Sequence, residues 1–116
     1  LPVDVTFVDE NDHVQYFSAG KERIFPRSPG IIGRSVQNCH PPKSLDVVTR
    51  IVGDFKSGAK DEAEFWIQIG GRLIYIRYYA VRDDDGEYRG TVEVSQDITD
   101  IKAIEGERRL LNWDSE

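Results

Sequence analysis

The chain has no methionine, one cysteine, two histidines and no long apolar run. A single cysteine cannot form an internal disulfide, so nothing in the sequence points to an oxidising compartment. No stretch approaches the roughly 20 apolar residues of a membrane-spanning helix. The opening L-P-V-D-V-T-F also lacks the basic start of a signal peptide. Because a translated protein begins with methionine, we expect the chain to be part of a longer protein.

Basic residues are also fewer than acidic residues. Lys and Arg number 15 against 21 Asp and Glu, which gives a formal net charge of −6. A nucleic-acid partner would require a basic surface, so this balance argues against one. The 116 residues, 39% of them hydrophobic and 31% charged, have room for one core and one modest ligand cavity. We therefore expect one soluble cytoplasmic domain with no membrane or nucleic-acid partner.

Five segments have the composition of β-strands, and two hairpin turns join some of them. Gly70-Gly71 forms a two-residue turn of the kind that fixes the register of a hairpin, and the run D-E-N-D forms the other turn. The predicted strands are Val3–Val8, Val14–Phe17, Phe65–Ile69, Leu73–Val81 and Gly90–Gln96.

Two helices are predicted between and after these strands. The main helix begins at Ser44, which can cap it, and Gly58 follows as the C-cap. Its apolar residues recur at helical spacing. A terminal helix from Thr99 would place Ile101, Ile104 and Leu111 on one side, although Gly106 weakens it. The apolar face of the main helix comprises Leu45, Val48, Ile51, Val52 and Phe55.

Strands that are separated from helices along the chain predict an α+β domain. We expect a five-stranded antiparallel sheet with helices on one face, a core over residues 1–98 and a C-terminal flanking helix over 99–116. The Gly70-Gly71 turn gives the hairpin one apolar face, which should meet the helices. The other face carries aromatic side chains that we expect another surface to cover. The apolar face pairs Ile69 with Arg72, Ile67 with Ile74, Phe65 with Ile76 and Ala63 with Tyr78.

This order of elements resembles a PAS domain over nearly the whole chain. The residues that carry the resemblance are I-I-G-R-S-V before the main helix, the G-G hairpin, D-D-D-G-E-Y-R-G before the last strand, and D-I-T before the terminal helix. The resemblance implies the PAS fold and a non-enzymatic sensory or dimerisation module. Such a module would bind a small ligand or cofactor between sheet and main helix and relay the change to attached domains.

A narrower resemblance rests on E-R-I-F-P-R-S-P-G-I-I-G-R-S-V-Q-N-C-H-P-P-K-S and on Q-D-I-T-D-I-K-A-I-E-G-E-R-R-L-L-N-W. These stretches look like the C-terminal PAS domain of bacterial and archaeal proteins that also carry a hemerythrin-like (HHE) cation-binding domain and a domain of unknown function. That resemblance implies that the partners are other domains of the same polypeptide and a second copy in a homodimer.

The predicted ligand pocket is apolar and lies between sheet and main helix. Tyr78 brings to it a hydroxyl that needs a partner when buried. The outer face is the predicted interface, with Trp66, Leu73, Tyr75 and Tyr79. The pocket residues are Ile51, Phe55, Phe65, Ile67, Ile74, Ile76, Tyr78, Val92 and Val94.

The stretch N-C-H-P-P-K-S leaves three alternatives open. The prolines extend the residues before them and start the helix, which is a purely structural role for Cys39 and His40. Haem needs only one or two axial ligands, so either residue could hold haem or iron in a redox or gas sensor. A catalytic Cys–His pair is the third alternative, although adjacent residues on an extended chain point to opposite sides. Zinc would need more ligands than these residues supply.

Overall fold

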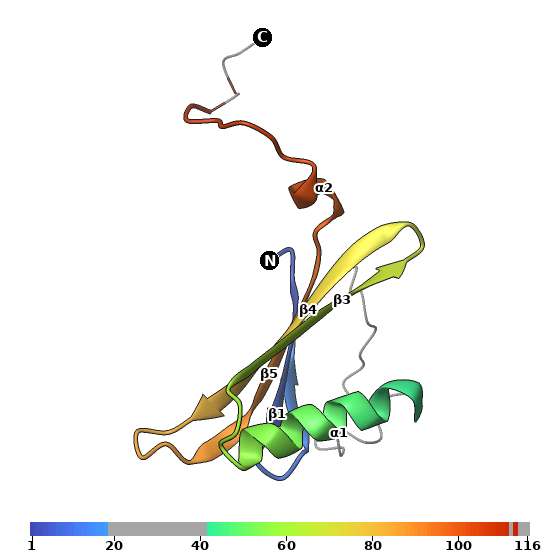
Figure 1. Ribbon diagram of the computed structural model, residues 1–116. Coiled ribbons are helices and arrows are strands. Elements are labelled where there is room, and N and C mark those ends of the chain that lie inside the picture. The colour runs from blue at the N-terminus through green and yellow to red at the C-terminus, as the bar shows by residue number, and fades with distance from the viewer. Residues whose placement is uncertain (19–41, 112, 114–116) are drawn as a thin grey trace.

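The computed structural model describes residues 1–18, 42–111 and 113, which form one five-stranded antiparallel sheet and two helices (Figure 1). The spatial order of the strands is β2-β1-β5-β4-β3, so β5 lies between β1 and β4. The predicted α+β fold and five-stranded antiparallel sheet are confirmed. In chain order the elements are β1 (Asp4–Asp9), β2 (Val14–Phe17), α1 (Pro42–Lys56), β3 (Glu62–Ile69), β4 (Arg72–Arg82), β5 (Tyr88–Asp97) and α2 (Thr99–Lys102).

The β3–β4 hairpin has the register that its turn predicts. Gly70 and Gly71 have φ values of 55° and 79°, a turn conformation in which glycine is free of steric penalty. Ile67 pairs with Ile74 and Trp66 with Tyr75. Since paired residues share a face, the turn decides which side chains of β3 lie on the same face as which side chains of β4.

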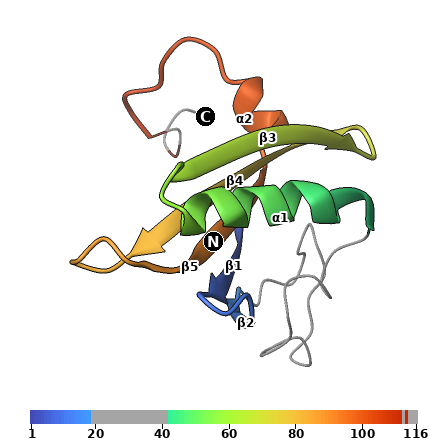
Figure 2. The same cartoon turned by 60° about the horizontal axis from the view of Figure 1, so that its bottom comes forward.

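Helix α1 lies across one face of the sheet (Figures 1 and 2). It begins at Pro42, earlier than the predicted start at Ser44, because the first helical turn needs no N–H and tolerates proline. It ends at Lys56, and the predicted C-cap is confirmed. Gly58 has a φ of 81°, and its N–H donates to the Phe55 carbonyl at 3.2 Å.

Two clusters of buried side chains join α1 to the sheet. Val48 and Val52 pack with Val8 of β1 and Val14 of β2. Phe55 is fully buried and forms the centre of the second cluster. Burial of a side chain of this size contributes about 1.5–3 kcal/mol, so these contacts fix α1 on the sheet. Phe55 packs with Ile74, Ile76 and Tyr78.

The terminal helix is shorter than predicted. Helix α2 ends at Lys102, and residues 103–111 are not helical. Gly106 has a φ of 65°, a left-handed conformation that an α-helix cannot contain. Ile104 and Leu111 therefore do not share a helical face, and both are exposed, by 72% and 67%.

Candidate functional site

The face of the sheet that meets α1, here called the inner face, holds five of the predicted pocket residues, and α1 contributes Ile51 and Phe55. Phe65 and Tyr78 stack with ring centroids 6.0 Å apart, which joins β3 to β4 beneath the helix. The side chains packed around Phe55 in this cluster are Ile51, Phe65, Ile67, Ile74, Ile76 and Tyr78.

The prediction that Val92 and Val94 face inward is wrong. Val94 pairs with Arg77, and Val92 pairs with Tyr79, so both valines lie on the outer face. The prediction assumed that the apolar residues of β5 point to the core. The hydrogen-bond register of β5 with both of its neighbours decides otherwise, because residue pairs share a face whatever their polarity.

The inner face of β1 and β5 is polar instead. Ser95 is fully buried, Thr91 is 3% exposed and Thr6 is 5% exposed. Glu93 is half-buried and pairs with Thr6 on β1 and with Tyr78 on β4. Buried polar groups require hydrogen-bond partners, whereas the apolar side chains around Phe55 do not. We call Asp4, Thr6, Thr91, Glu93 and Ser95 the polar strip.

Two hydrogen bonds between side chains lie in or beside the strip. The Ser95 hydroxyl donates to Glu93 Oε1 at 3.4 Å. The Tyr88 and Thr91 hydroxyls lie 2.8 Å apart, and burial raises the pKa of Tyr88. The strip thus offers carboxylate and hydroxyl groups, which can accept hydrogen bonds from a polar ligand.

A second cluster of polar groups fixes the junction between β5 and α2. The Thr99 hydroxyl donates to Asp97 Oδ1 at 2.7 Å and accepts from the Leu73 N–H at 2.8 Å. Arg72 Nε donates to Asp97 Oδ2 at 2.7 Å, and Arg72 Nη2 donates to Asp100 Oδ2 at 3.3 Å. The start of α2 is therefore tied to the first residues of β4.

The other end of β4 is tied to α1. Arg82 Nη2 donates to the Phe55 carbonyl at 2.8 Å and to the Lys60 carbonyl at 3.2 Å. Arg82 Nε pairs with Asp61 Oδ1 at 2.9 Å. One strand thus carries an arginine at each end. Arg82 holds the C-terminal end of α1, and Arg72 holds the start of α2.

The Asp97 carboxyl should titrate well below its usual range. The hydrogen bonds from Arg72 and then from Thr99 lower its pKa from 3.8 to about 2. The ionised form is therefore favoured in the folded state. The stabilisation is fully present above pH 3.8 and is lost as the pH falls towards about 2. An NMR titration of the carboxyl carbon should give this low pKa, and Arg72→Met should raise it towards 3.8.

The matched control for that titration is Arg89→Met. Arg89 pairs with Asp83 at 2.9 Å in a different turn, so its removal deletes an arginine of similar exposure without touching Asp97. An Asp97 pKa that stays near 2 in Arg72→Met would show that the Arg72 bond does not hold the junction.

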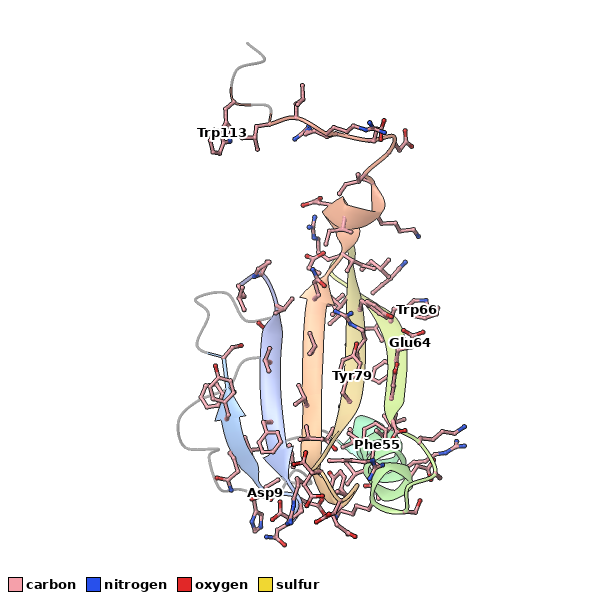
Figure 3. The ribbon with its side chains drawn as sticks, turned by 90° about the vertical axis from the view of Figure 1, so that its left-hand side faces the viewer. Asp9, Phe55, Glu64, Trp66, Tyr79 and Trp113 are labelled. Atoms are coloured by element: carbon pink, nitrogen blue, oxygen red, sulfur yellow. The ribbon has the colours of Figure 1, made fainter. Side chains whose placement is uncertain are left out.

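The outer face carries the predicted interface residues. Trp66 is 64% exposed, while Leu73, Tyr75 and Tyr79 are half-buried. The rings of Trp66 and Tyr75 lie 6.5 Å apart, and Figure 3 shows Trp66, Glu64 and Tyr79 along β3 and β4. Whether this face forms an interface is a prediction that stays open.

A hollow of about 370 Å³ lies on this face over β3 and β4. The Arg77 guanidinium lies 4.9 Å from the centroid of the Tyr75 ring. The Tyr75 hydroxyl donates to the Glu64 carboxylate, and this bond raises the pKa of Tyr75. The lining residues are Glu62, Ala63, Glu64, Tyr75, Arg77 and Tyr79.

Cys39 and His40 lie outside the described residues, so the haem, iron and catalytic alternatives stay predictions. Within residues 1–18, 42–111 and 113, no group of three or more His, Cys, Asp or Glu side chains could hold a metal ion. In the same part of the chain, no helix has the length and hydropathy needed to cross a membrane.

The polar strip is the feature that sequence reasoning missed. Its signal was present, because Asp4 and Thr6 alternate with Val5 and Phe7, as Glu93 and Ser95 do with Val92 and Val94. Alternation shows that two faces differ but does not tell which face meets a helix.

The sequence profile of the PAS domain family matches residues 1–99. The crystal structure of the C-terminal domain of a Streptococcus mutans protein has 36% sequence identity and a TM-score of 0.81, over 90% of this chain and 82% of that one. No curated protein matches the chain in sequence.

Two histidine kinase structures share the fold at lower identity. A sensory box sensor histidine kinase from Vibrio cholerae has 12% identity and a TM-score of 0.68, over 85% of this chain and 83% of that one. The PAS domain of histidine kinase ThkA has 14% identity and a TM-score of 0.64, over 84% of this chain and all of that domain (100%).

Proposed function

Because the chain belongs to the PAS domain family, we propose that it is a non-enzymatic sensory module that binds a small polar ligand between the sheet and α1. The observation that carries the proposal is the polar strip. Thr6, Thr91 and Ser95 are buried beside the half-buried Glu93 on the face that meets α1. Most core positions hold apolar side chains, so a row of buried polar groups on this face gives a ligand hydrogen-bonding groups that an ordinary core does not offer.

The ligand class follows from the chemistry of the strip. Carboxylates accept hydrogen bonds, and hydroxyls both donate and accept them. A ligand with an amino, hydroxyl or amide group could add hydrogen bonds to these groups, whereas an aliphatic ligand could neither donate to them nor accept from them. The neighbouring apolar cluster around Phe55 would contact the non-polar part of the same molecule.

Strand β4 is the proposed relay. A ligand that moves α1 would pull on Arg82, which bonds the Phe55 carbonyl at the helix end. The opposite end of β4 holds α2 through Arg72 and the Leu73 N–H. Ligand binding would thereby shift the equilibrium between two positions of α2, to the extent that the ligand binds one of them more tightly.

We also propose that the attached domains of a longer polypeptide receive the signal. The similarity to the C-terminal domain of a Streptococcus mutans protein supports a C-terminal place in a longer chain. A hemerythrin-like domain is the partner that the sequence resemblance suggests. A cytoplasmic location fits the single cysteine and the acidic composition.

The first test is native mass spectrometry of the purified protein, followed by a thermal-shift screen with amino acids, polyamines, carboxylic acids and nucleotides. We expect a retained mass, or a polar compound that raises the melting temperature by mass action. An absorption spectrum is recorded in the same experiment, because a Soret band would show that the bound molecule is haem and not a small polar ligand. The proposal fails if aliphatic compounds alone stabilise the protein.

Glu93→Gln should weaken binding of the compound that this screen identifies. A hydrogen bond to a charged group contributes about 1.5–3 kcal/mol, so the dissociation constant should rise about 10-fold or more. Isothermal titration calorimetry measures it. The control is Glu87→Gln, which makes the same change at an exposed position of the β4–β5 turn. Equal changes of the dissociation constant in the two variants would show that Glu93 does not contact the ligand.

A further inference from the structure

Strand β3 forms an open edge of the sheet. Within the part of the chain that the structure describes, it pairs with β4 on one side and with no strand on the other. Figure 3 shows it as the outermost strand on the side away from β2. An edge strand exposes a row of backbone N–H and C=O groups that can pair with another chain. We call the free side of Glu62–Ile69 the β3 edge.

The hydrogen-bond pattern shows which residues supply this row. The Ala80 N–H donates to the Asp61 carbonyl at 2.9 Å, so these two residues form a hydrogen-bonded pair. In an antiparallel ladder such pairs alternate with pairs whose N–H and C=O groups point away from each other. The odd-numbered residues of β3 therefore bond to β4, and the groups of the even-numbered residues point to the β3 edge. These even-numbered residues are Glu62, Glu64, Trp66 and Gln68.

The two edges of the sheet differ in their protection against pairing. Strand β2 has only four residues, and its register with β1 shifts between Phe7 and Val8. Short strands and irregular registers keep an edge from pairing with another chain. Strand β3 has eight residues, contains no Lys, Pro or Gly, and pairs with β4 without a shift. The β3 edge therefore has the regular shape that an added strand needs.

The side chains along the β3 edge are acidic at one end and aromatic in the middle. Glu62 and Glu64 are exposed, and no salt bridge among the described residues neutralises either carboxylate. The nearest arginine on β4, Arg77, has its guanidinium over the Tyr75 ring. Trp66 follows on the same face and is 64% exposed. The edge therefore offers two carboxylates and one large apolar surface to a partner.

These charges favour a basic segment over a second copy of the chain. The chain has a formal net charge of −6, so two copies repel each other, whereas a segment with Lys or Arg is attracted. Residues opposite each other on paired strands share a face. Basic side chains at alternate positions of an added strand would therefore lie beside Glu62 and Glu64. The side chains between them would lie on the other face, beside the half-buried Phe65 and Ile67.

We propose that the β3 edge binds an extended basic segment of a partner protein, which joins the sheet as one more antiparallel strand. Backbone hydrogen bonds supply affinity in this mode of recognition, and alternate side chains supply specificity. In chain direction the segment has an apolar residue beside Trp66, then Lys or Arg two and four residues later, beside Glu64 and Glu62. The site lies away from the space between sheet and α1, so it is independent of the proposed sensory function.

The test uses the fluorescein-labelled peptide T-V-F-V-K-V-K-T and fluorescence anisotropy. We expect saturable binding, and about 10-fold weaker binding of a peptide of the same composition without the alternation. Methylation of the backbone nitrogens of its phenylalanine and first lysine removes two hydrogen bonds to the edge, so the dissociation constant should rise about 10-fold or more. In Trp113→Phe, Trp66 is the remaining tryptophan, and its emission should move to shorter wavelength when unlabelled peptide binds.

Two changes in the protein test the same contacts. Gln68→Pro removes an N–H from the β3 edge and leaves the bonds to β4 intact, because proline is tolerated on the free side of an edge strand. It should weaken binding about 10-fold, whereas the control Gln68→Ala, which keeps the N–H, should change it less than about 2-fold.

Glu62→Lys with Glu64→Lys should also weaken binding about 10-fold and should favour a peptide with glutamates in place of the two lysines. Its control is Glu10→Lys with Glu87→Lys, which changes the net charge equally at exposed positions off β3. Equal binding of the alternating and the rearranged peptide, or binding that Gln68→Pro and backbone methylation leave unchanged, would overturn the proposal. A dimer in native mass spectra that Gln68→Pro abolishes would also overturn it and assign the edge to a second copy.

Discussion

Replacing Phe55 with alanine should lower the free energy of unfolding by about 3–5 kcal/mol, the usual range for a fully buried phenylalanine. Phe55 is 0% exposed and lies at the centre of the cluster with Ile74, Ile76 and Tyr78. Its carbonyl also accepts the Arg82 hydrogen bond that ties α1 to β4. Domains of this size have a total stability of about 5–15 kcal/mol, so the change is a large fraction of it.

Urea unfolding followed by circular dichroism measures this loss. Val47→Ala on the same helix is the control, because Val47 is 47% exposed and its truncation should change stability by less than about 0.5 kcal/mol. If Phe55→Ala does not fold, Phe55→Leu keeps most of the volume and should lose about 1 kcal/mol. Equal stability of the two alanine variants would show that α1 is not packed on the sheet through Phe55.

Gly90→Ala should destabilise the protein by about 1–3 kcal/mol, the usual effect of forcing an atom into a packed region. A Cβ atom at this position would lie 2.3 Å from the Val8 carbonyl oxygen and 2.6 Å from the Phe7 ring. The nearest atom belongs to the backbone of β1, so it cannot rotate away. The paired strands must therefore separate, and the ring of Phe7 must also move.

Gly53→Ala is the matched control for this substitution. Gly53 lies inside α1, and a Cβ there would meet nothing within 4 Å. Alanine should therefore stabilise the helix by about 1 kcal/mol. Thermal unfolding of both variants should move the melting temperature in opposite directions. Equal shifts would mean that β1 and β5 are not packed as closely as the structure has them.

Both substitutions bear on the proposed relay. Phe55 lies where α1, the inner face and the Arg82 bond meet, and Gly90 lies on β5 against Phe7 and Val8 of β1. The polar strip is on the same two strands, β1 and β5. If Phe55→Ala or Gly90→Ala folds, we therefore expect it also to change the affinity for the ligand, whereas Val47→Ala should leave the affinity unchanged.

The sequence by itself determined the five strands, the main helix and the register of the β3–β4 hairpin. The two glycines at positions 70 and 71 fix a tight turn, and every pair of β3 and β4 follows from it because pairing propagates residue by residue. Gly58 likewise ended α1 as predicted, since the left-handed conformation that it adopts is local. The PAS resemblance rests on the same G-G hairpin together with other short stretches of the sequence, and it is confirmed by the match over residues 1–99.

Only the tertiary structure decided which face of β5 meets α1. The alternation of Val92 and Val94 with Glu93 and Ser95 is visible in the sequence, but both faces of a central strand can be buried. The register of β5 with β4 contains an irregularity between Val81 and Arg82, next to the turn that joins the two strands. The register of β5 with β1 joins strands that are far apart along the chain, so no local turn fixes it. For this reason the pocket predicted as apolar has a polar strip, and the valines belong to the outer face.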